Sequence, residues 1–362
     1  MTRILYGLCS VGIGHAVRSK LILEHLFKKH DVLIVASGKA YNYLEKFFPK
    51  NILNIEGFEL VFNDNSIESF GTVLVNLKKV SGKTLDNINK CKEKMNRFNP
   101  DVVVSDWEPF TSFYAKNKNL PLISIDNQHY LVFGDLHFPK RYWFQYMKAR
   151  AVLQSLMRKS DYYIISLFPG NKLKHKNNIY AVPPIIRKDV LGKRAYKKDY
   201  VLVYQSTKSY DRLVDILKSV NQKFIIYGFD KNKKQGNITF KKFNTGYGFT
   251  RDLANAKAVI ANGGFTLISE ALYLRKPLLV IPIRKHFEQI INACYIQENK
   301  YGEFYEDLDE KSLSHFLMNL ENFKIPRRKA DNKKVLKLID KIIERDVNLW
   351  ELHIFQIHFI LN

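Results

Sequence analysis

Residues 258–293 of the 362-residue chain read AVIANGGFTLISEALYLRKPLLVIPIRKHFEQIINA. An apolar run of strand length (258–261) is followed by two glycines and a segment of helix length, and a second apolar run (278–282) leads into another such segment. Strands that alternate with helices in this way are typical of βαβ units around a parallel sheet. The glycine pair lies where the strand ends and the helix begins, and a helix start of this kind favours anion binding.

The same alternation extends along most of the chain, in two series separated by Pro183-Pro184 and a charged stretch. We expect strands at 4–9, 32–36, 101–105, 122–126, 162–166, 200–204, 223–227, 258–261 and 278–282, and helices at 16–29, 39–48, 72–98, 140–159 and 310–320. The sequence therefore predicts an α/β fold with two Rossmann-like, doubly wound domains. We predict their bounds as 1–183 and 199–345, with a linker at 184–198 and an apolar C-terminal tail at 346–362.

The chain is strongly basic, since 58 Lys and Arg against 35 Asp and Glu give a net charge of +23. The 62 residues from 137 to 198 carry +13 of this surplus, because they hold 15 basic residues against two acidic ones. Such a surplus indicates an anionic partner. Nucleic acid is the less favoured one, because the sequence contains no recognised nucleic-acid-binding motif.

Within this region, 140–159 combines six basic residues with Tyr142, Trp143, Phe144, Tyr146 and Met147. One interpretation is a helix that contacts an anionic membrane surface. The other is an ordinary crossover helix that packs its apolar face on the sheet and leaves its basic face in solvent.

The cellular location is predicted from what the sequence lacks. Cys9, Cys91 and Cys294 lie far apart, without a disulfide or zinc pattern, and no apolar run is long enough to be a signal peptide or a membrane span. We expect a cytoplasmic protein, with peripheral attachment to the inner face of the membrane as an extension of that prediction. The 17-residue tail is expected to fold back onto the first domain, with a membrane contact or a dimer interface as alternatives.

The first candidate site follows the first predicted strand, in Gly12-Ile13-Gly14-His15-Ala16-Val17-Arg18. This is not the dinucleotide-binding fingerprint, because Val17 occupies the position of its third glycine. His15 lies at the carboxyl end of a strand, where open α/β sheets bind ligands, and a histidine there can act as a general base. The alternative is a histidine that caps the helix or packs in the core.

Polar residues also follow two further strands of the first series. Asp106 and Glu108 come after the strand at 101–105, and a carboxylate there can orient His15 or accept a proton itself. The alternative is a helix N-cap, since a proline follows. Asn127, Gln128 and His129 come after the strand at 122–126 and are candidates for binding a polar substrate, or else form an ordinary polar loop.

The residues quoted at the outset form the most specific candidate site. Gly263 and Gly264 open a helix whose first N–H groups can hold a diphosphate. Glu270, about two turns into that helix, can accept two hydrogen bonds from a ribose diol. Glu288 and Gln289 begin the next helix, where they can bind sugar hydroxyls. The D-x-D sequence at 307–309 resembles a metal-binding motif, but its place before a predicted helix favours a helix-start role.

Residues 262–293 resemble the donor-binding segment of GT-B nucleotide-sugar glycosyltransferases, most closely the MurG-like bacterial and archaeal group. The Gly-x-Gly-His-x-x-Arg-Ser opening at 12–19 resembles the N-terminal loop of the same group. Ser105-Asp106-x-Glu108-Pro109 and 126–129 resemble a subgroup of uncharacterised glycosyltransferases. The resemblance covers about residues 1–300 and implies two Rossmann-like domains that face each other across a cleft.

The resemblance also implies roles for individual residues. The first domain would bind the acceptor and the second the nucleotide-sugar donor. Where relatives carry a glycine-rich phosphate loop, this chain has Gln205-Ser206-Thr207. By position, donor-binding residues would be Ser206, Phe249, Thr250, Gly263, Gly264, Phe265, Thr266, Glu270, Glu288 and Gln289, and acceptor-binding residues would be Gly14, Arg18, Glu108, Asn127, Gln128 and His129.

The expected activity is therefore that of an inverting hexosyltransferase that uses a UDP-linked sugar. An acceptor hydroxyl, deprotonated by His15 or Asp106, would attack the anomeric carbon as the nucleoside diphosphate leaves. The helix start at Gly264 would stabilise the leaving charge, so we expect no metal or other cofactor. The expected acceptor is a glycolipid or a cell-surface glycan precursor. The alternatives are a nucleotide-sugar epimerase of the same fold and a non-catalytic, basic nucleic-acid-binding protein.

Overall fold

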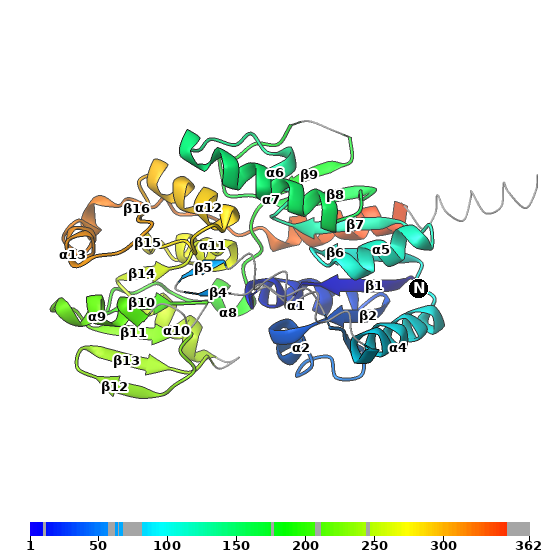
Figure 1. Ribbon diagram of the computed structural model, residues 1–362, viewed down its shortest axis with the longest axis horizontal. Coiled ribbons are helices and arrows are strands. Elements are labelled where there is room, and N and C mark those ends of the chain that lie inside the picture. Colours follow the sequence, from blue (N-terminus) through cyan, green and yellow to red (C-terminus); the bar gives the residue numbers. More distant parts are fainter. Residues whose placement is uncertain are drawn as a thin grey trace, which may run out of the picture.

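The computed structural model describes residues 1–9, 12–56, 62–63, 65–67, 82–174, 177–206, 211–243 and 247–345. They form two α/β units side by side, each built on a seven-stranded sheet (Figure 1). This architecture confirms the predicted fold class of two Rossmann-like units.

The first sheet has the order β3-β2-β1-β6-β7-β8-β9, with all neighbouring strands parallel. Because the chain runs outward from β1 in one direction and then resumes at β6 on the other side, a crevice forms at the carboxyl ends of these two strands. The strands are β1 (Arg3–Leu8), β2 (Asp31–Ala36), β3 (Ile52–Asn54), β6 (Val102–Asp106), β7 (Leu122–Asp126), β8 (Tyr162–Ser166) and β9 (Ile179–Val182).

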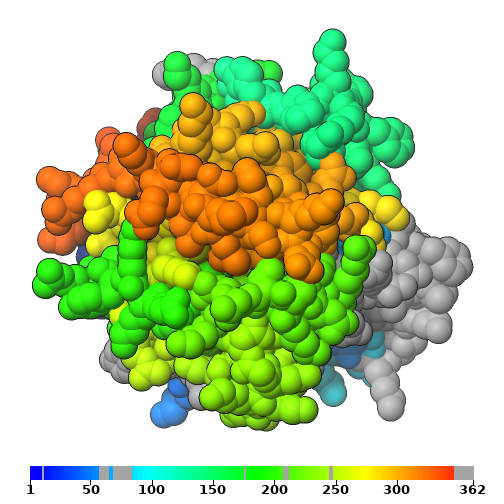
Figure 2. Space-filling view, turned by 90° about the vertical axis from the view of Figure 1, so that its left-hand side faces the viewer, coloured from blue at the N-terminus to red at the C-terminus, as the bar shows by residue number. Residues whose placement is uncertain are grey.

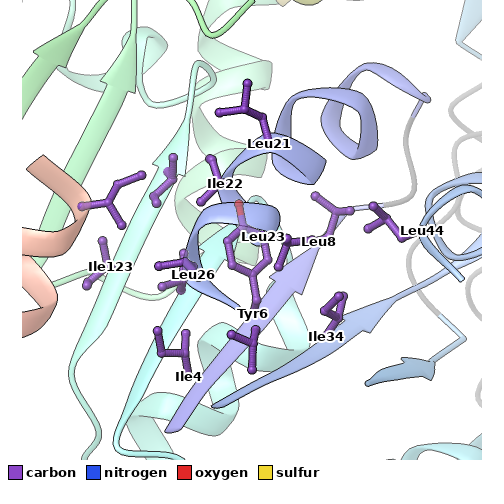
Figure 3. Close-up of a cluster of buried hydrophobic side chains, with 14 of the residues drawn as sticks. Ile4, Tyr6, Leu8, Leu21, Ile22, Leu23, Leu26, Ile34, Leu44 and Ile123 are labelled. Atoms are coloured by element: carbon purple, nitrogen blue, oxygen red, sulfur yellow. The ribbon is translucent and has the colours of Figure 1, made fainter. Parts of the chain in front are cut away.

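Helices cover both faces of this sheet, because successive side chains of a buried parallel strand point to opposite faces. Ile4, Tyr6 and Leu8 pack under α1 (Figure 3), whereas Leu5 joins the core on the other face. The helices of the unit are α1 (Gly14–Leu26), α2 (Gly38–Leu44), α4 (Gly82–Phe98), α5 (Pro109–Asn117), α6 (Tyr130–Phe133), the 3-10 turn η1 (Lys140–Tyr142) and α7 (Trp143–Leu156).

The second sheet has the order β12-β13-β11-β10-β14-β15-β16, in which only β12 is antiparallel to its neighbour. Its order reverses between β10 and β14, so a second crevice faces the first. The strands are β10 (Val201–Tyr204), β11 (Phe224–Tyr227), β12 (Lys233–Gln235), β13 (Ile238–Lys241), β14 (Ala258–Ala261), β15 (Leu278–Val280) and β16 (Gly302–Phe304). The helices are α8 (Lys188–Leu191), α9 (Asp211–Ser219), α10 (Tyr247–Asn255), α11 (Phe265–Tyr273), α12 (Phe287–Glu298), α13 (Glu310–Met318) and the 3-10 turn η2 (Leu320–Asn322).

The two units meet along an apolar seam between α12 and the α6–α7 region. Phe287 of α12 lies 4.9 Å from Phe138 and 5.4 Å from Tyr146, measured between ring centroids. A second contact comes from the short hairpin of β4 (Phe62–Asn63) and β5 (Ser66–Ile67), where the Ile67 N–H donates to the Arg284 carbonyl at 3.1 Å. Two segments of the first unit, the α6–α7 region and the β4–β5 hairpin, thus contact the second unit.

A helix at residues 332–345 returns to the first unit after the second sheet is complete. Its Val335, Ile339 and Ile343 are buried in the core between α1 and the first sheet. At the start of this helix, the Asn332 side chain bonds both the N–H and the carbonyl of Ile186, at 3.0 and 2.6 Å. The last part of the predicted range 199–345 therefore packs with the first unit, and the predicted tail at 346–362 lies outside the described residues.

Several predicted elements differ in their bounds. The expected helix at 72–98 is described only from Gly82, as α4, and the helix expected at 39–48 ends at Leu44. Asp309 of the D-x-D sequence caps α13, since its carboxylate accepts from the Ser312 N–H at 2.8 Å, which confirms the helix-start interpretation. In the part of the chain that the structure describes, no helix has both the length and the apolar character that a membrane crossing requires.

Candidate functional site

The two crevices enclose one cavity of about 390 Å³. It lies at the carboxyl ends of the strands of both sheets, where βα loops place side chains that the scaffold does not need for packing. Its lining comes from both units: Gly12, Ile13, Gly14, His15, Val17, Arg18, Gly38, Lys39, Trp107, Asn127, Gln128, Arg187, Tyr204, Ser206, Phe243, Phe249, Asn262, Gly264, Phe265, Thr266, Leu267, Ile283, His286, Glu288 and Gln289.

His15 and Asp106 form a pair on the first-unit side of the cavity. The loop after β1 begins α1 at Gly14, and β6 ends at Asp106, so adjacent parallel strands bring the two side chains together. His15 Nδ1 lies 2.8 Å from Asp106 Oδ1. His15 lines the cavity, whereas Asp106 is fully buried behind it.

Asp106 is held as a carboxylate by the groups around it. Burial alone would raise its pKa, but the Arg18 guanidinium and His15 outweigh burial and lower that pKa to about 2. Arg18 donates to both carboxylate oxygens, and the Ser19 hydroxyl donates to Oδ2 at 2.9 Å. An ionised Asp106 accepts the Nδ1 proton of His15 and leaves the Nε2 lone pair directed away from Asp106.

A chain of hydrogen bonds crosses the cavity from this pair to α12. The Gln128 Nε2 group lies 3.1 Å from His15 Nε2 and also 3.1 Å from Glu288 Oε2. Asn127 donates to Glu288 Oε1 at 2.9 Å and accepts from Arg18 at 2.5 Å. Glu288 therefore binds both amides of the first unit, so the predicted acceptor residues Asn127 and Gln128 and the predicted donor residue Glu288 are brought together.

The glycine pair after β14 places the start of α11 at the cavity. Gly263 packs against backbone, because a Cβ added there would lie 2.3 Å from the Gln289 carbonyl oxygen. Gly264 caps α11, lines the cavity and has open space where its side chain would be. The first N–H groups of α11 therefore lie at the cavity wall, where the helix dipole favours an anion.

The contacts around this helix start hold the two units in register. The Thr266 hydroxyl donates to the Gly14 carbonyl at 3.2 Å, which joins the starts of α11 and α1. Asn262 accepts from the N–H and the hydroxyl of Ser206, at 2.9 and 3.0 Å, so the loops after β10 and β14 are fixed to each other. The Gln289 amide oxygen accepts from the Ile283 N–H at 2.8 Å.

Glu270 is bound to a residue of the linker. Arg187 donates to both of its carboxylate oxygens, each at 2.6 Å, and Glu270 is fully buried. Arg187 itself lines the cavity, with its guanidinium carbon 5.5 Å from the Phe249 ring centroid. Phe249, Phe243 and Tyr204 form an aromatic wall beside it, with ring centroids 5.1 to 6.3 Å apart.

Five of the predicted substrate-binding residues do not line the cavity, and one of them is the buried Glu270. Glu108 is the N-cap of α5 and accepts from the Phe110 and Thr111 N–H groups, so the capping role belongs to Glu108 rather than to Asp106. His129 is buried against Asp126, 2.6 Å away. Thr250 and Gly263 are also absent from the lining. The predictions that Glu108 and His129 touch an acceptor have no support in this arrangement.

Several lining residues were not predicted from the sequence, among them Arg187, His286 and Trp107. Arg187 lies in the charged linker, where one more basic residue gave no distinct signal. His286 precedes Glu288 and faces the cavity, and burial, with His15 nearby, lowers its pKa. Trp107 has a φ of +51°, a strained conformation for a bulky residue, and its indole nitrogen has no hydrogen-bond partner among the described residues. The one signal in the sequence that pointed to Trp107 was its position between the two candidate residues Asp106 and Glu108.

Comparisons with known proteins agree with this geometry. The profile of a family described as Glycosyl transferase family 1 matches residues 2–321. An uncharacterized glycosyltransferase of Methanosarcina mazei is 23% identical over 337 residues, which cover 83% of this chain and 85% of that protein. An enzyme of Pelagibacter ubique, named UDP-N-acetylglucosamine--N-acetylmuramyl-(pentapeptide) pyrophosphoryl-undecaprenol N-acetylglucosamine transferase, is 28% identical over 181 residues, 43% of this chain and 49% of that one.

Among solved structures, MurG of Acinetobacter baumannii superposes with a TM-score of 0.57 at 14% identity, covering 94% of this chain and 100% of that one. At this identity the likeness concerns the fold, which is the predicted GT-B architecture. The family match confirms the predicted enzyme class and disfavours the epimerase and nucleic-acid-binding alternatives.

Proposed function

Since the chain belongs to Glycosyl transferase family 1 and is a GT-B glycosyltransferase, we propose that it transfers a hexose, with inversion, from a UDP-linked donor to an acceptor hydroxyl. The proposal assigns the acceptor to the first unit and the nucleotide to the second. The acceptor class that we propose is a glycolipid or a precursor of a cell-surface glycan.

One observation carries this proposal: His15, which Asp106 holds from behind, and the start of α11 line the same cavity from opposite units. A group-transfer reaction at an anomeric carbon needs a base on the attacking side and charge stabilisation on the leaving side. His15 supplies the first, and the N–H groups at the start of α11, from Phe265 onward, supply the second. Attack from the side opposite the leaving group gives inversion.

His15, rather than Asp106, is the proposed base. Asp106 is fully buried and has both oxygens bonded, whereas His15 Nε2 faces the cavity side of the pair. As the acceptor oxygen bonds to the anomeric carbon, its proton passes to His15 Nε2. The bond from that carbon to the diphosphate breaks, and the electron pair leaves with the diphosphate. Asp106 stays ionised and stabilises the imidazolium.

Gln128 stands where the acceptor hydroxyl has to bind. Its Nε2 group is the polar neighbour of His15 Nε2, at 3.1 Å. We therefore expect the acceptor hydroxyl to displace the Gln128 amide from His15. We expect the donor sugar to replace the same amide as the hydrogen-bond donor to Glu288. The side chains of Gln289 and Trp107 also line the cavity beside this position.

The donor side has three features that suit a nucleoside diphosphate. The aromatic wall of Tyr204, Phe243 and Phe249 suits a flat base. Arg187 and the start of α11 suit the diphosphate charge. When Arg187 turns toward the phosphates, the ribose diol takes its place on Glu270, so the buried carboxylate keeps two hydrogen-bond donors.

The test measures donor binding first and chemistry second. Calorimetry with UDP, dTDP and GDP should give the tightest binding for UDP, and NMR of the product from a UDP-hexose should show the inverted anomer. Activity should survive EDTA, because the proposed stabilisation of the leaving group comes from backbone N–H groups and Arg187. A retained anomeric configuration, or turnover that EDTA abolishes and Mg²⁺ restores, would contradict the mechanism.

A further inference from the structure

A second cavity, of about 190 Å³, lies where α12 meets the segment after α6 and the loop after β8. α12 contributes Ile291, Tyr295 and Glu298, whose spacing of four and three residues places them on one helical face. The first unit contributes the rest of the lining from two segments, 130–137 and 170–172. In Figure 2 the yellow-orange atoms of the α12 region meet blue-green and green atoms of the first unit along the upper part of the molecule. This hollow is called the outer cavity below, and the larger one the main cavity.

The outer cavity adjoins the main cavity but is separate from it. A gap of about 10 Å³ lies between the two. Asn127 and Glu288 of the main cavity line this gap, together with Tyr130 and Ile291 of the outer one. A gap of that size holds about one water molecule, which needs about 10–15 Å³. The two compartments therefore meet at the hydrogen bond between Asn127 and Glu288.

The floor of the outer cavity is apolar and held in place. Tyr130, Ile291 and Tyr295 are buried. The Tyr130 hydroxyl donates to the Asp135 carbonyl at 3.0 Å, and the Tyr295 hydroxyl donates to the Pro169 carbonyl at 2.9 Å. Because both hydroxyls are already bonded to backbone, the two rings are fixed and serve a ligand as an apolar surface.

The rim of the outer cavity is polar. Asp135, His137, Lys172 and Glu298 line the cavity and are exposed, and their side chains make no hydrogen bond or ion pair to another described residue. Burial and then the carboxylates of Asp135 and Glu298 raise the pKa of Tyr130 to about 12. The two carboxylates therefore act on the same ring of the floor, one from each unit.

Backbone hydrogen bonds hold the first-unit part of this rim in shape. The Asp135 N–H donates to the Lys172 carbonyl at 3.0 Å, and the Lys174 N–H donates to the Phe133 carbonyl at 2.8 Å. Beside them Gly170 has a φ of +94°, and no atom lies within 4 Å of the position that its side chain would take. The polar side chains thus stand on a fixed frame around an open hollow.

We propose that the outer cavity binds one sugar ring of a glycan, distinct from the sugar that is transferred. Sugar hydroxyls donate to carboxylates such as Asp135 and Glu298 and accept from an ammonium such as Lys172, and the C–H face of a sugar ring packs on aromatic floors. A rim with charges of both signs suits a neutral ring. The size agrees, because drug-sized ligands need roughly 300–1,000 Å³ and the outer cavity is smaller.

The choice of a sugar rests on the proposed function, in which an acceptor glycan lies beside His15. α12 runs from Glu288 at the main cavity to Glu298 at the outer one, a distance of about 15 Å along the helix. A glycan that lies along α12 with its reacting hydroxyl at His15 therefore places a more distant ring in the outer cavity.

The test is saturation-transfer NMR of the full chain with the methyl glycosides of glucose, galactose, mannose and N-acetylglucosamine. We expect at least one of them to bind. The double variant Asp135→Ala/Glu298→Ala should weaken that binding about tenfold or more, because a hydrogen bond to a charged group contributes about that much to affinity. Lys172→Ala should weaken it as well. The substituted side chains are exposed, so each variant should keep the unmodified melting temperature.

A matched control is Asp86→Ala/Glu93→Ala, which removes two exposed carboxylates from α4. It should leave glycoside binding unchanged, and a loss equal to that of Asp135→Ala/Glu298→Ala would show an effect of net charge and overturn the proposal. Binding of none of the four glycosides to the unmodified chain would also overturn it. So would full binding in Asp135→Ala/Glu298→Ala, which would place the sugar in another part of the molecule.

UDP calorimetry separates the outer cavity from the donor site. UDP affinity should stay within about twofold in Asp135→Ala/Glu298→Ala, since distant sites act independently. UDP binding without glycoside binding would overturn the outer sugar site alone. Glycoside binding that depends on Asp135 and Glu298, in a chain that does not bind UDP, would overturn the proposed function and leave the outer site in place.

Discussion

The environment of Asp106 is the basis for proposing His15 as the base. Its carboxylate is buried, ionised and bonded through both oxygens, and only the imidazole that it holds reaches the cavity. The sequence left His15 and Asp106 as equal candidates for the base. Burial supports His15 as the proposed base, and a strand end and a polar motif cannot reveal burial by themselves.

The first prediction concerns His15. His15→Ala should lower kcat about 100-fold or more, because it removes general-base catalysis. Donor affinity measured by calorimetry should stay within about twofold, since the imidazole lies on the acceptor side of the cavity. Asp106→Asn provides the comparison and should lower kcat because the neutral amide cannot stabilise the imidazolium. Full turnover in His15→Ala would show that another group is the base.

A second prediction concerns the buried pair of Arg187 and Glu270. Arg187→Ala and Glu270→Ala should each weaken UDP binding, the first through loss of the diphosphate contact and the second through loss of the ribose contact. Because the two side chains bond to each other, the double variant should lose less than the sum of the single losses, with a coupling of about 0.5–3 kcal/mol. Strictly additive losses in calorimetry would contradict the exchange of Arg187 for the ribose diol.

The sequence located residues of the cavity where the motif and the contact share one segment, and the roles assigned to those residues stay predictions. His15, Gly264, Gln289 and Glu288 all line the cavity as expected. Glu108 caps α5 and does not line the cavity, and a carboxylate before a proline has the same local pattern whether it caps a helix or binds a ligand. Arg187 was missed because its partner, Glu270, is distant in sequence and only the fold brings the two together.

Among the elements, the turn between β14 and α11 shows what each of its two glycines is for. Gly263 allows close approach to the α12 backbone, and Gly264 opens the wall of the cavity. The glycine pair in the sequence predicted a turn at a helix start. The sequence could not show which glycine has which role, because each role depends on the elements that lie beside that glycine in the fold.

Substitution at the two positions should therefore have opposite effects. Gly263→Ala should lower the free energy of unfolding by about 1–3 kcal/mol, because its Cβ would overlap the Gln289 carbonyl. Gly264→Ala should leave stability within about 0.5 kcal/mol, yet weaken donor binding by placing a methyl group at the helix start. Urea unfolding and UDP calorimetry on both variants check this. Equal stability of the two variants would contradict the packing role of Gly263.

The sequence also predicted elements unequally. Buried parallel strands such as β1 and β14 were located because their apolar runs are continuous. The three- or four-residue strands β3, β9, β12 and β16 were not predicted, since runs of that length occur in loops as often as at sheet edges. These edge strands complete the sheets without contributing to the cavity.

At the scale of the whole molecule, the low pKa of Asp106 links folding to pH. The carboxyl group has a pKa of about 2 when folded, against an ordinary value of 3.8. The folded state therefore binds fewer protons than the unfolded state between these values. A depressed carboxyl pKa stabilises the fold above pH 3.8, and that contribution is lost as the pH falls toward 2.

We expect this one group to contribute about 2 kcal/mol to the free energy of unfolding above pH 4. Unfolding by urea at a series of pH values should show a loss on acidification that is smaller by this amount in Asp106→Asn. Asp101→Asn is a suitable control, because Asp101 is also paired with an arginine but is partly exposed, so its contribution should be smaller. If the free energy of unfolding fell equally with pH in the unmodified chain and in Asp106→Asn, the proposed contribution of Asp106 would be contradicted.

The division into two units was predicted from the repeated alternation, but the return of residues 332–345 to the first unit was not. Val335, Ile339 and Ile343 give this helix an apolar face in the sequence. That pattern predicts that the apolar face of the helix is buried. It cannot predict which of the two sheets the face packs against. The choice depends on the space that α1 and the first sheet leave open, which is a property of the assembled fold.

The paired hydrogen bonds between Asn332 and Ile186 have a mechanical consequence. The chain passes between the units once near Ile186 and again just before Asn332, and the two passages are joined where they meet. Because the two connections are joined at one point, a rotation of one unit against the other would have its axis near that point. Displacement grows with distance from an axis, and Arg187 directly follows Ile186. Arg187 therefore lies beside this double connection as well as at the wall of the cavity, and such a rotation would displace it less than the contacts that lie farther away.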